Sequence, residues 1–139
     1  MIEPTDEQIR SLLEKSRRIA VVGLTTDQSR PSYGVARYLQ SVGYVILPVN
    51  PRHAGQTILG EQVVAKVTEL DGPIDIVDVF RRSIDIPRPV DEAIAADAGA
   101  IWMQLGIRND EVGQTAAAAG LFVVMNRCIS VEHRRLLNH

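Results

Sequence analysis

The chain has 139 residues, 45% of them hydrophobic and 23% charged, and its 15 basic and 17 acidic residues give a net charge of −2, as in ordinary soluble domains. The single cysteine, Cys128, excludes an internal disulfide, and no apolar run reaches the roughly 18 residues of a membrane span. No charged segment precedes an apolar one at the start, which disfavours secretion. We expect one domain over residues 1–139, in a reducing, cytoplasmic compartment.

The first half of the chain alternates between helices and strands. Thr5 or Asp6 can cap a first helix, while Ser32 can cap a second helix that Gly43 ends. Short β-branched runs between these helices predict strands. In chain order we expect a helix at 5–16, a strand at 18–23, a helix at 32–42, a strand at 44–49, a short edge strand at 57–59 and a weak helix at 63–70.

The second half continues the same alternation. Pro87 or Pro89 falls in the first turn of a helix, and Asn109 or Asp110 can cap the next one. In chain order we expect a strand at 74–79, a helix at 87–98, a strand at 100–103, a helix at 109–119, a strand at 121–125 and a terminal helix at 130–137.

Five short apolar strands that alternate with helices predict a parallel sheet covered on both faces and joined by right-handed crossovers. This is a doubly wound α/β fold with a five-stranded parallel sheet. With the strands numbered in chain order, we expect the order 3-2-1-4-5, which puts the topological switch point between strands one and four. Ligands of such sheets bind outside the carboxyl ends of the strands.

Thirteen of the fifteen basic residues are Arg. GC-biased coding enriches Arg without a physical cause, so position along the chain must decide what this excess means. An Arg follows each expected strand on the same edge of the sheet, namely Arg30, Arg52, Arg81, Arg82, Arg108 and Arg127. Together they predict a local positive field for a small polyanion, and they argue against nucleic acid, which requires a broader basic face. Any single one of them can instead cap a helix or solvate a loop.

The loop at 23–34 joins the first strand to a helix, where backbone amides and a helix N-terminus can bind phosphate. It matches neither G-x-G-x-x-G nor a P-loop, and as a bare pattern it is equally consistent with a helix-capping loop. The loop has a glycine that permits a tight turn after the strand, Gly23, three hydroxyl groups on Thr25, Thr26 and Ser32, and one positive charge on Arg30.

The second strand ends in Asn50-Pro51-Arg52, where an NAD site would place an acidic residue on the ribose. The missing acid and the added Arg favour a phosphorylated ribose, as in NADP or in the 3′-phosphate of coenzyme A. Asp78 on the third strand has no acidic pair after the first strand, which disfavours a phosphoacceptor site. We expect Asp78 to hydrogen-bond to neighbouring loop backbone.

With these residues in view, the chain resembles the small stand-alone CoA-binding domain proteins, whose Rossmann-like fold is similar to the N-terminal domain of the succinyl-CoA synthetase α subunit. The resemblance covers nearly the whole chain. It rests on Ala20-Val-Val-Gly-Leu-Thr25, Arg30-Pro-Ser-Tyr33, Pro48-Val-Asn-Pro51, Val77-Asp-Val-Phe-Arg81, Trp102-Met-Gln-Leu-Gly106 and Met125-Asn-Arg-Cys-Ile129.

The resemblance implies coenzyme A as the cofactor and assigns roles to the matching residues. The loop from Gly23 to Ser32 would cradle the CoA phosphates, and Tyr33 follows it in the matching segment. The other expected contacts are the 3′-phosphorylated ribose at Asn50 and Arg52, the adenine end at Phe80 and Arg81, and the pantetheine path at Gln104 and Gly106.

The synthetase has a following domain with a phosphorylated histidine, which this sequence lacks. None of His53, His133 and His139 lies in a matching motif, so no ligase activity is expected, and we interpret His133 and His139 as surface residues. We identify no catalytic residue and no metal-ligand spacing. Trp102, Met103 and Met125 are interpreted as core residues.

Cys128 follows the fifth strand at the ligand edge, beside Arg127 and before the helix that opens at Ser130. A neighbouring cation and a helix dipole would lower the pKa of its thiol. One hypothesis is a mixed disulfide with the CoA thiol, which would make the chain a redox-responsive CoA binder. The alternative is a small buried hydrophobic residue after a core strand.

The sequence therefore favours a protein that binds CoA or an acyl-CoA without identifiable catalytic machinery. The alternative is an NADP-dependent oxidoreductase or another nucleotide-binding enzyme at the same edge. A third interpretation, an interaction module without a ligand, would leave the Arg residues unexplained. The expected partner is a small molecule, with no nucleic acid and no membrane. A homo-oligomer stays open, because an exposed edge strand at 57–59 could pair with a second copy.

Overall fold

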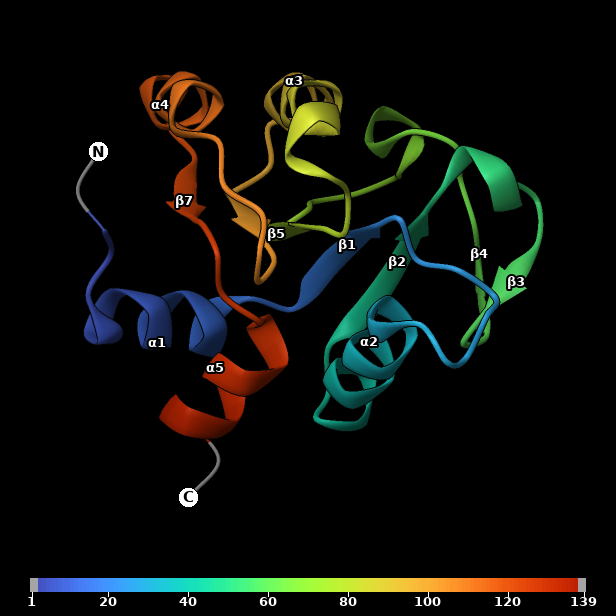
Figure 1. The fold of residues 1–139 in the computed structure, drawn as a ribbon. Coiled ribbons are helices and arrows are strands. Elements are labelled where there is room, and N and C mark those ends of the chain that lie inside the picture. The colour runs from blue at the N-terminus through green and yellow to red at the C-terminus, as the bar shows by residue number, and fades with distance from the viewer. Residues whose placement is uncertain (1–2, 138–139) are drawn as a thin grey trace.

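The computed structural model describes residues 3–137 and has a five-stranded parallel sheet at its centre (Figure 1). Its strands occur in the spatial order β2-β1-β5-β6-β7. They are β1 (Arg18–Val22), β2 (Val45–Val49), β5 (Ile76–Val79), β6 (Ala100–Met103) and β7 (Phe122–Val124). A small antiparallel hairpin, β3 (Thr57–Ile58) and β4 (Glu61–Gln62), lies beyond β2 (Figure 1).

Helices cover both faces of the sheet, and each face has its own apolar core. One face packs against α1 (Asp6–Lys15), α2 (Pro31–Ser41) and α5 (Ile129–Leu136). The other packs against α3 (Pro87–Ala95) and α4 (Asp110–Ala118). Three single 3-10 turns complete the fold: η1 (Pro51–His53), η2 (Val67–Glu69) and η3 (Ser83–Asp85). Among residues 3–137, no helix has both the length and the hydropathy needed to cross a membrane.

The predicted alternation of strands and helices is confirmed, with differences at four places. The helix predicted at 87–98 ends at Ala95, and the edge strand predicted at 57–59 is the hairpin strand β3, which pairs with β4. Ser32 does not cap α2, because the helix starts one residue earlier, with Pro31 in its first turn and Arg30 at the N-cap. The weak helix predicted at 63–70 is only the 3-10 turn η2, because Val64 is extended and bridges to Val49 of β2.

The predicted order 3-2-1-4-5 is wrong, because β5, the third long strand, pairs with β1 and β6 rather than with β2. The outer edge of β2 is instead occupied by Val64, whose amide donates to the Pro48 carbonyl at 3.1 Å. The amide nitrogen and the carbonyl of a strand residue face the same edge. Pro48, whose carbonyl faces the outer edge of β2, therefore offers no amide hydrogen to a strand on that side. A proline within a strand marks an edge strand, and β2 is one.

The topological switch point therefore lies between β1 and β5, where the chain leaves the sheet toward α2 on one face and toward α3 on the other (Figure 1). The chain segments that follow β1 and β5 approach each other closely at Gly23, which has φ +92°. A Cβ atom at Gly23 would lie 2.5 Å from the Phe80 carbonyl oxygen. Only glycine satisfies both this backbone conformation and this approach.

Candidate functional site

A cavity of about 880 Å³ opens at the carboxyl edge of the sheet, at this switch point. Its volume lies within the range of roughly 300–1,000 Å³ that is typical of small-molecule sites. The loops that follow β1, β2, β5, β6 and β7 all contribute to its lining. Eleven of the thirteen predicted site residues line it: Gly23, Thr25, Arg30, Ser32, Asn50, Arg52, Phe80, Arg81, Gln104, Gly106 and Cys128.

The other two predicted residues, Thr26 and Tyr33, do not line the cavity. Thr26 is exposed, and Tyr33 packs against the core on the α2 face of the sheet. Of the hydroxyl groups that the sequence offered here, those of Thr25 and Ser32 line the cavity, whereas those of Thr26 and Tyr33 do not.

The loop after β1 presents polar groups to the cavity in a defined arrangement. The Thr25 hydroxyl accepts a hydrogen bond from the Asp27 amide at 3.2 Å and lies 3.4 Å from Nε2 of His53. No side chain caps α2, which leaves first-turn amides such as that of Ser32 without a capping oxygen. Because these amides carry the positive end of the helix dipole, this side of the cavity can hold a phosphate.

Asn50 holds the loops after β1 and β2 together. Its buried amide group donates from Nδ2 to the Leu24 carbonyl at 3.0 Å and accepts at Oδ1 from the Arg52 amide at 3.0 Å. Because both ends of the Asn50 amide are already hydrogen-bonded, we interpret its main role as holding the turn that carries Arg52 and His53 at the cavity. His53 lines the cavity and was missed as a site residue, although it follows Arg52 directly after the second strand.

The cavity lining is cationic, because the described lining includes four arginines and no Asp or Glu. Within residues 3–137, Arg52 and Arg81 have no ion-pair partner. Arg30 and Arg82 each pair with an exposed aspartate, at 3.7 Å and 3.1 Å. A ligand with several negative charges would compete with these weak exposed pairs.

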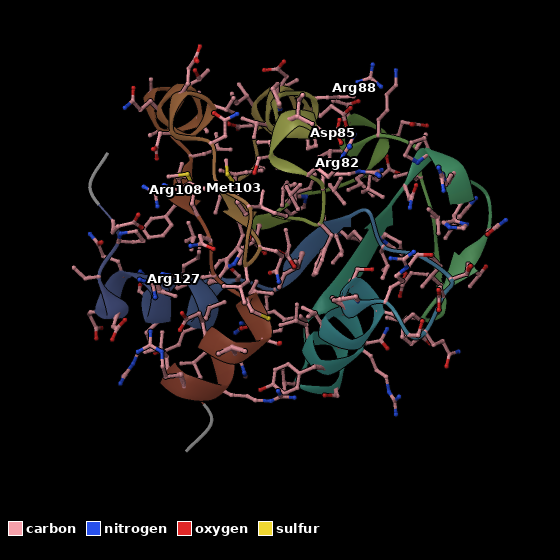
Figure 2. The ribbon with its side chains drawn as sticks, in the orientation of Figure 1. Arg82, Asp85, Arg88, Met103, Arg108 and Arg127 are labelled. Atoms are coloured by element: carbon pink, nitrogen blue, oxygen red, sulfur yellow. The ribbon has the colours of Figure 1, made fainter. Side chains whose placement is uncertain are left out.

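The predicted set of six arginines is only partly correct. Arg108 pairs with Glu3 at 2.7 Å and with Asp110 at 3.0 Å, and these partners raise the pKa of its guanidinium. Arg127 pairs with Glu132 at 2.9 Å. Neither arginine lines the cavity, and Figure 2 shows both on the side of β7, away from Arg82. The pattern after each strand could not show which arginines find acidic partners nearby.

Gln104 and Cys128 are also part of the cavity lining. Gln104 is buried, and its Oε1 accepts a hydrogen bond from the first amide of α5, that of Ile129, at 3.1 Å. Cys128 is partly buried at the N-cap of α5, and its Sγ lies 3.3 Å from the Ser130 hydroxyl. The start of α5 is thereby fixed against the end of β6.

The pKa of the Cys128 thiol is lowered overall. Burial raises it, but the Ser130 hydroxyl, the Val131 amide, the Gln104 side chain and the Ser130 amide together outweigh that effect by stabilising the thiolate. The direction agrees with the expectation from the sequence. Arg127, the other expected cause, is engaged by Glu132 instead.

Asp78 does not make the expected hydrogen bond to loop backbone. Its side chain is completely buried in β5, and neither carboxyl oxygen has a hydrogen-bond partner among the described residues. Burial raises the pKa of this carboxyl well above its usual range, and the charge of Cys128 raises it further. Burial without a hydrogen-bond partner therefore favours the neutral form of the Asp78 carboxyl.

His133 is not a surface residue, contrary to the expectation. It is buried between Tyr38 and Tyr44, and its Nδ1 lies 2.7 Å from the Tyr38 hydroxyl. Burial, with a smaller contribution from Arg134, lowers the pKa of the imidazole. The corresponding expectation for His139 lies outside the described residues. Trp102, Met103 and Met125 are buried, as predicted.

Comparisons with known proteins find a matching family and similar chains. A family described as "CoA binding domain" matches the chain over residues 17–134. The uncharacterized protein YneT of Bacillus subtilis (strain 168) is 42% identical over 133 residues, which make up 96% of this chain and 97% of YneT. The solved structure of cell-free ID.343 from Thermus thermophilus is 42% identical, with a TM-score of 0.93, and the match covers 96% of this chain and 100% of that chain.

A more distant likeness is to the dinucleotide forming acetyl-coenzyme A synthetase 1 of Ca. Korarchaeum cryptofilum. It is 21% identical, with a TM-score of 0.68, over 76% of this chain and 25% of that chain. At this identity the likeness concerns the fold alone, which is Rossmann-like in both.

Proposed function

The chain belongs to the CoA-binding domain family, and we propose that it binds coenzyme A or an acyl-CoA in the cavity at the carboxyl edge of its sheet. The observation that carries this proposal is the lining, which combines arginines, an uncapped helix N-terminus and no acidic side chain among the described residues. CoA carries a diphosphate and a 3′-phosphate, so a cationic cavity of this volume suits it.

In the proposed arrangement the diphosphate lies against the loop after β1, and the 3′-phosphate lies at Arg52. Phe80 and Arg81 border the adenine, while Gln104 and Gly106 line the path of the pantetheine arm toward Cys128. These placements are supported by the cavity lining and by the unpaired state of Arg52 and Arg81 within residues 3–137. Thr26 and Tyr33 have no place in this arrangement, because neither lines the cavity.

A panel of thermal shifts tests the proposed ligand. A ligand at 100 times its Kd stabilises the folded state by about 2.7 kcal/mol, and for a domain of this size the melting midpoint rises by several degrees. We expect CoA and acetyl-CoA to shift the midpoint, and NADPH, NADH and ADP to shift it less. A shift with NADPH and none with CoA would instead support the oxidoreductase, and no shift with any ligand would support an interaction module.

We also propose that Cys128 can form a mixed disulfide with CoA. CoA disulfide is the oxidant in this step. The Cys128 thiolate attacks one sulfur of the CoA disulfide, the bond between the two CoA sulfurs breaks, and a new bond forms between Cys128 and one CoA. The other CoA leaves as a thiolate and takes a proton from solvent. The lowered pKa of Cys128 and its place in the cavity lining support this step.

Intact mass after incubation with CoA disulfide tests the mixed disulfide. We expect one CoA adduct on the native chain, reversed by a reducing thiol, and none on the Cys128→Ser variant. Since Cys128 is the only cysteine, any adduct on the native chain must be at this residue. Absence of an adduct would leave Cys128 as a small packing residue.

A further inference from the structure

Cys128 lies where two hollows of the surface meet. It lines the cavity proposed for CoA, and it also lines a smaller groove of about 360 Å³. Leu105 is the other residue common to both linings. Leu105 and Val131, which also lines the groove, are 70% and 54% exposed, although both are large hydrophobic residues. The groove therefore continues the cavity past Cys128 and offers apolar surface there.

The charged side chains of this groove are already paired. Arg108 pairs with Glu3 at 2.7 Å, and Arg127 pairs with Glu132 at 2.9 Å. All four line the groove, and Figure 2 shows both arginines on the side of β7. Because its described lining has apolar side chains and no unpaired charge, the groove suits an uncharged acyl chain better than one that ends in a carboxylate.

The start of α5 surrounds the Cys128 sulfur with hydrogen-bond donors. Cys128 is the N-cap residue, and its Sγ lies 3.3 Å from the hydroxyl of Ser130, which is itself buried. No side chain caps this helix, so its first amides face Cys128 with the positive end of the helix dipole. These groups lower the pKa of the thiol, and the thiolate is the form of cysteine that acts as a nucleophile.

The Gln104 side chain has a free donor beside this sulfur. Gln104 is only 5% exposed and lines the cavity, and its Oε1 accepts from the Ile129 amide at 3.1 Å. Because that amide can only donate, the bond fixes Oε1 toward α5 and turns Nε2 the other way. Among residues 3–137, Nε2 has no hydrogen-bond partner other than the Cys128 sulfur. A buried donor needs an acceptor, and the carbonyl oxygen of a thioester in the cavity would supply one.

We propose that Cys128 accepts the acyl group of an acyl-CoA, with Gln104 as the donor to the carbonyl oxygen and with an uncharged acyl chain in the groove beyond Cys128. The identity of the acyl donor rests on the proposed function. The transfer itself goes beyond binding, because it makes the chain a carrier of the acyl group.

The step exchanges one thioester for another. The Cys128 thiolate attacks the carbonyl carbon, and the carbonyl oxygen becomes an oxyanion that accepts a hydrogen bond from Nε2 of Gln104. The bond between that carbon and the CoA sulfur then breaks, and the acyl group stays on Cys128 as a new thioester. CoA leaves as a thiolate and takes a proton from solvent. No oxidant or reductant is consumed.

Intact mass after incubation with hexanoyl-CoA tests the transfer, with a phosphine reductant present so that no disulfide forms. We expect the mass of one hexanoyl group on the native chain, removed by neutral hydroxylamine as a thioester is, and no such adduct on Cys128→Ser. Adipyl-CoA has the same chain length but ends in a carboxylate, so it should acylate Cys128 more slowly. Equal rates for the two donors would overturn the groove as the site of the acyl chain.

The hexanoyl thioester of N-acetylcysteamine separates this inference from the proposed CoA site, because it carries a thioester without a nucleotide. Acylation of Cys128 by this small donor, in a chain that no CoA compound stabilises in the thermal shifts, would support the acceptor and contradict the CoA site. Absence of an adduct from both donors would overturn the acceptor. If CoA stabilises that same chain, the proposed function stands without the transfer.

Gln104→Glu tests the donor, because it keeps an oxygen for the Ile129 amide but loses Nε2. Loss of one oxyanion donor typically costs about 10²–10³ in rate, so we expect acylation to slow at least about tenfold. Alkylation of Cys128 by iodoacetamide forms no oxyanion, so its rate reports the thiol alone and should fall by less. Gln114→Glu, the same change at an exposed residue of α4, is the matched control and should alter neither rate. Equal falls in acylation and alkylation would overturn the role of Gln104.

Discussion

Replacement of Arg52 by alanine gives the sharpest test of how the cavity recognises its ligand. Arg52 is exposed, lines the cavity and has no ion-pair partner within residues 3–137. Among the described residues, no hydrogen bond involves the Arg52 side chain. Its backbone amide donates to Oδ1 of Asn50, and alanine keeps that amide. Arg52→Ala should therefore leave the melting midpoint of the free protein unchanged and affect only the ligand.

The expected loss follows from the exposure of Arg52. Two unit charges 4 Å apart interact by about 1 kcal/mol in water and about 4 kcal/mol at the effective dielectric constant of a protein surface. A hydrogen bond to a charged group contributes about 1.5–3 kcal/mol. We expect Arg52→Ala to weaken CoA by about 1–3 kcal/mol, which is about 5-fold to 150-fold in Kd. Dephospho-CoA lacks the 3′-phosphate and should lose less than about 2-fold.

Isothermal titration of both ligands against the native chain and Arg52→Ala measures this difference. Arg37→Ala is the matched control, because Arg37 is an exposed arginine of α2 that does not line the cavity. Both ligands should bind the control as they bind the native chain. Equal losses for CoA and dephospho-CoA, or no loss for either, would refute the contact between Arg52 and the 3′-phosphate.

Three further predictions concern stability. In urea unfolding, Gly23→Ala should lower the free energy of unfolding by more than Gly55→Ala. Both glycines have positive φ, but only the new Cβ at Gly23 would meet backbone, the Phe80 carbonyl oxygen, at 2.5 Å. Equal losses would show that the close approach of Gly23 to Phe80 is unimportant. The pKa of His133 is lowered in the folded state, so below about pH 6.5 the folded state binds fewer protons than the unfolded state. The free energy of unfolding should therefore fall as the pH drops from 7 to 5 and level off below the pKa of the folded state. A slope that persists unchanged in His133→Gln would contradict this cause. Asp78→Val should raise the free energy of unfolding by about 1–3 kcal/mol, because it removes a buried carboxyl that has no hydrogen-bond partner among residues 3–137. A lower free energy of unfolding would indicate that the carboxyl forms a stabilising hydrogen bond.

Much of the fold could be predicted because its signals are local. The periodicity of apolar residues, the cap at Thr5 and the β-branched runs predicted the five long strands and the five α-helices, although not the extended backbone at Val64. They also predicted a parallel sheet with helices on both faces. The strand order was predicted wrongly even though a local signal was present. Pro48 cannot donate on the outer side of β2, and this alone indicates an edge strand.

The candidate site was predictable to the extent that it depends on strand ends. Residues directly after parallel strands gather at one edge whatever the strand order, so most of the predicted residues line one cavity. The sequence could not show that Thr26 and Tyr33 lie outside the cavity, because Thr26 is exposed in the loop whereas Tyr33 lies in α2 and packs against the core. His53 was missed because it becomes a cavity residue only through the turn that Asn50 holds.

The sequence by itself determined the elements, the parallel sheet and the edge at which a ligand would be held, because each follows from short-range patterning and from the geometry of parallel strands. Only the tertiary structure decided which arginines stay unpaired, since Glu3 and Glu132 reach Arg108 and Arg127 from distant or differently folded segments. It also decided that His133 is buried and that the Asp78 carboxyl is buried without a hydrogen-bond partner among residues 3–137. Burial and charge pairing depend on which segments meet in space, and the order of residues along the chain does not contain that information locally.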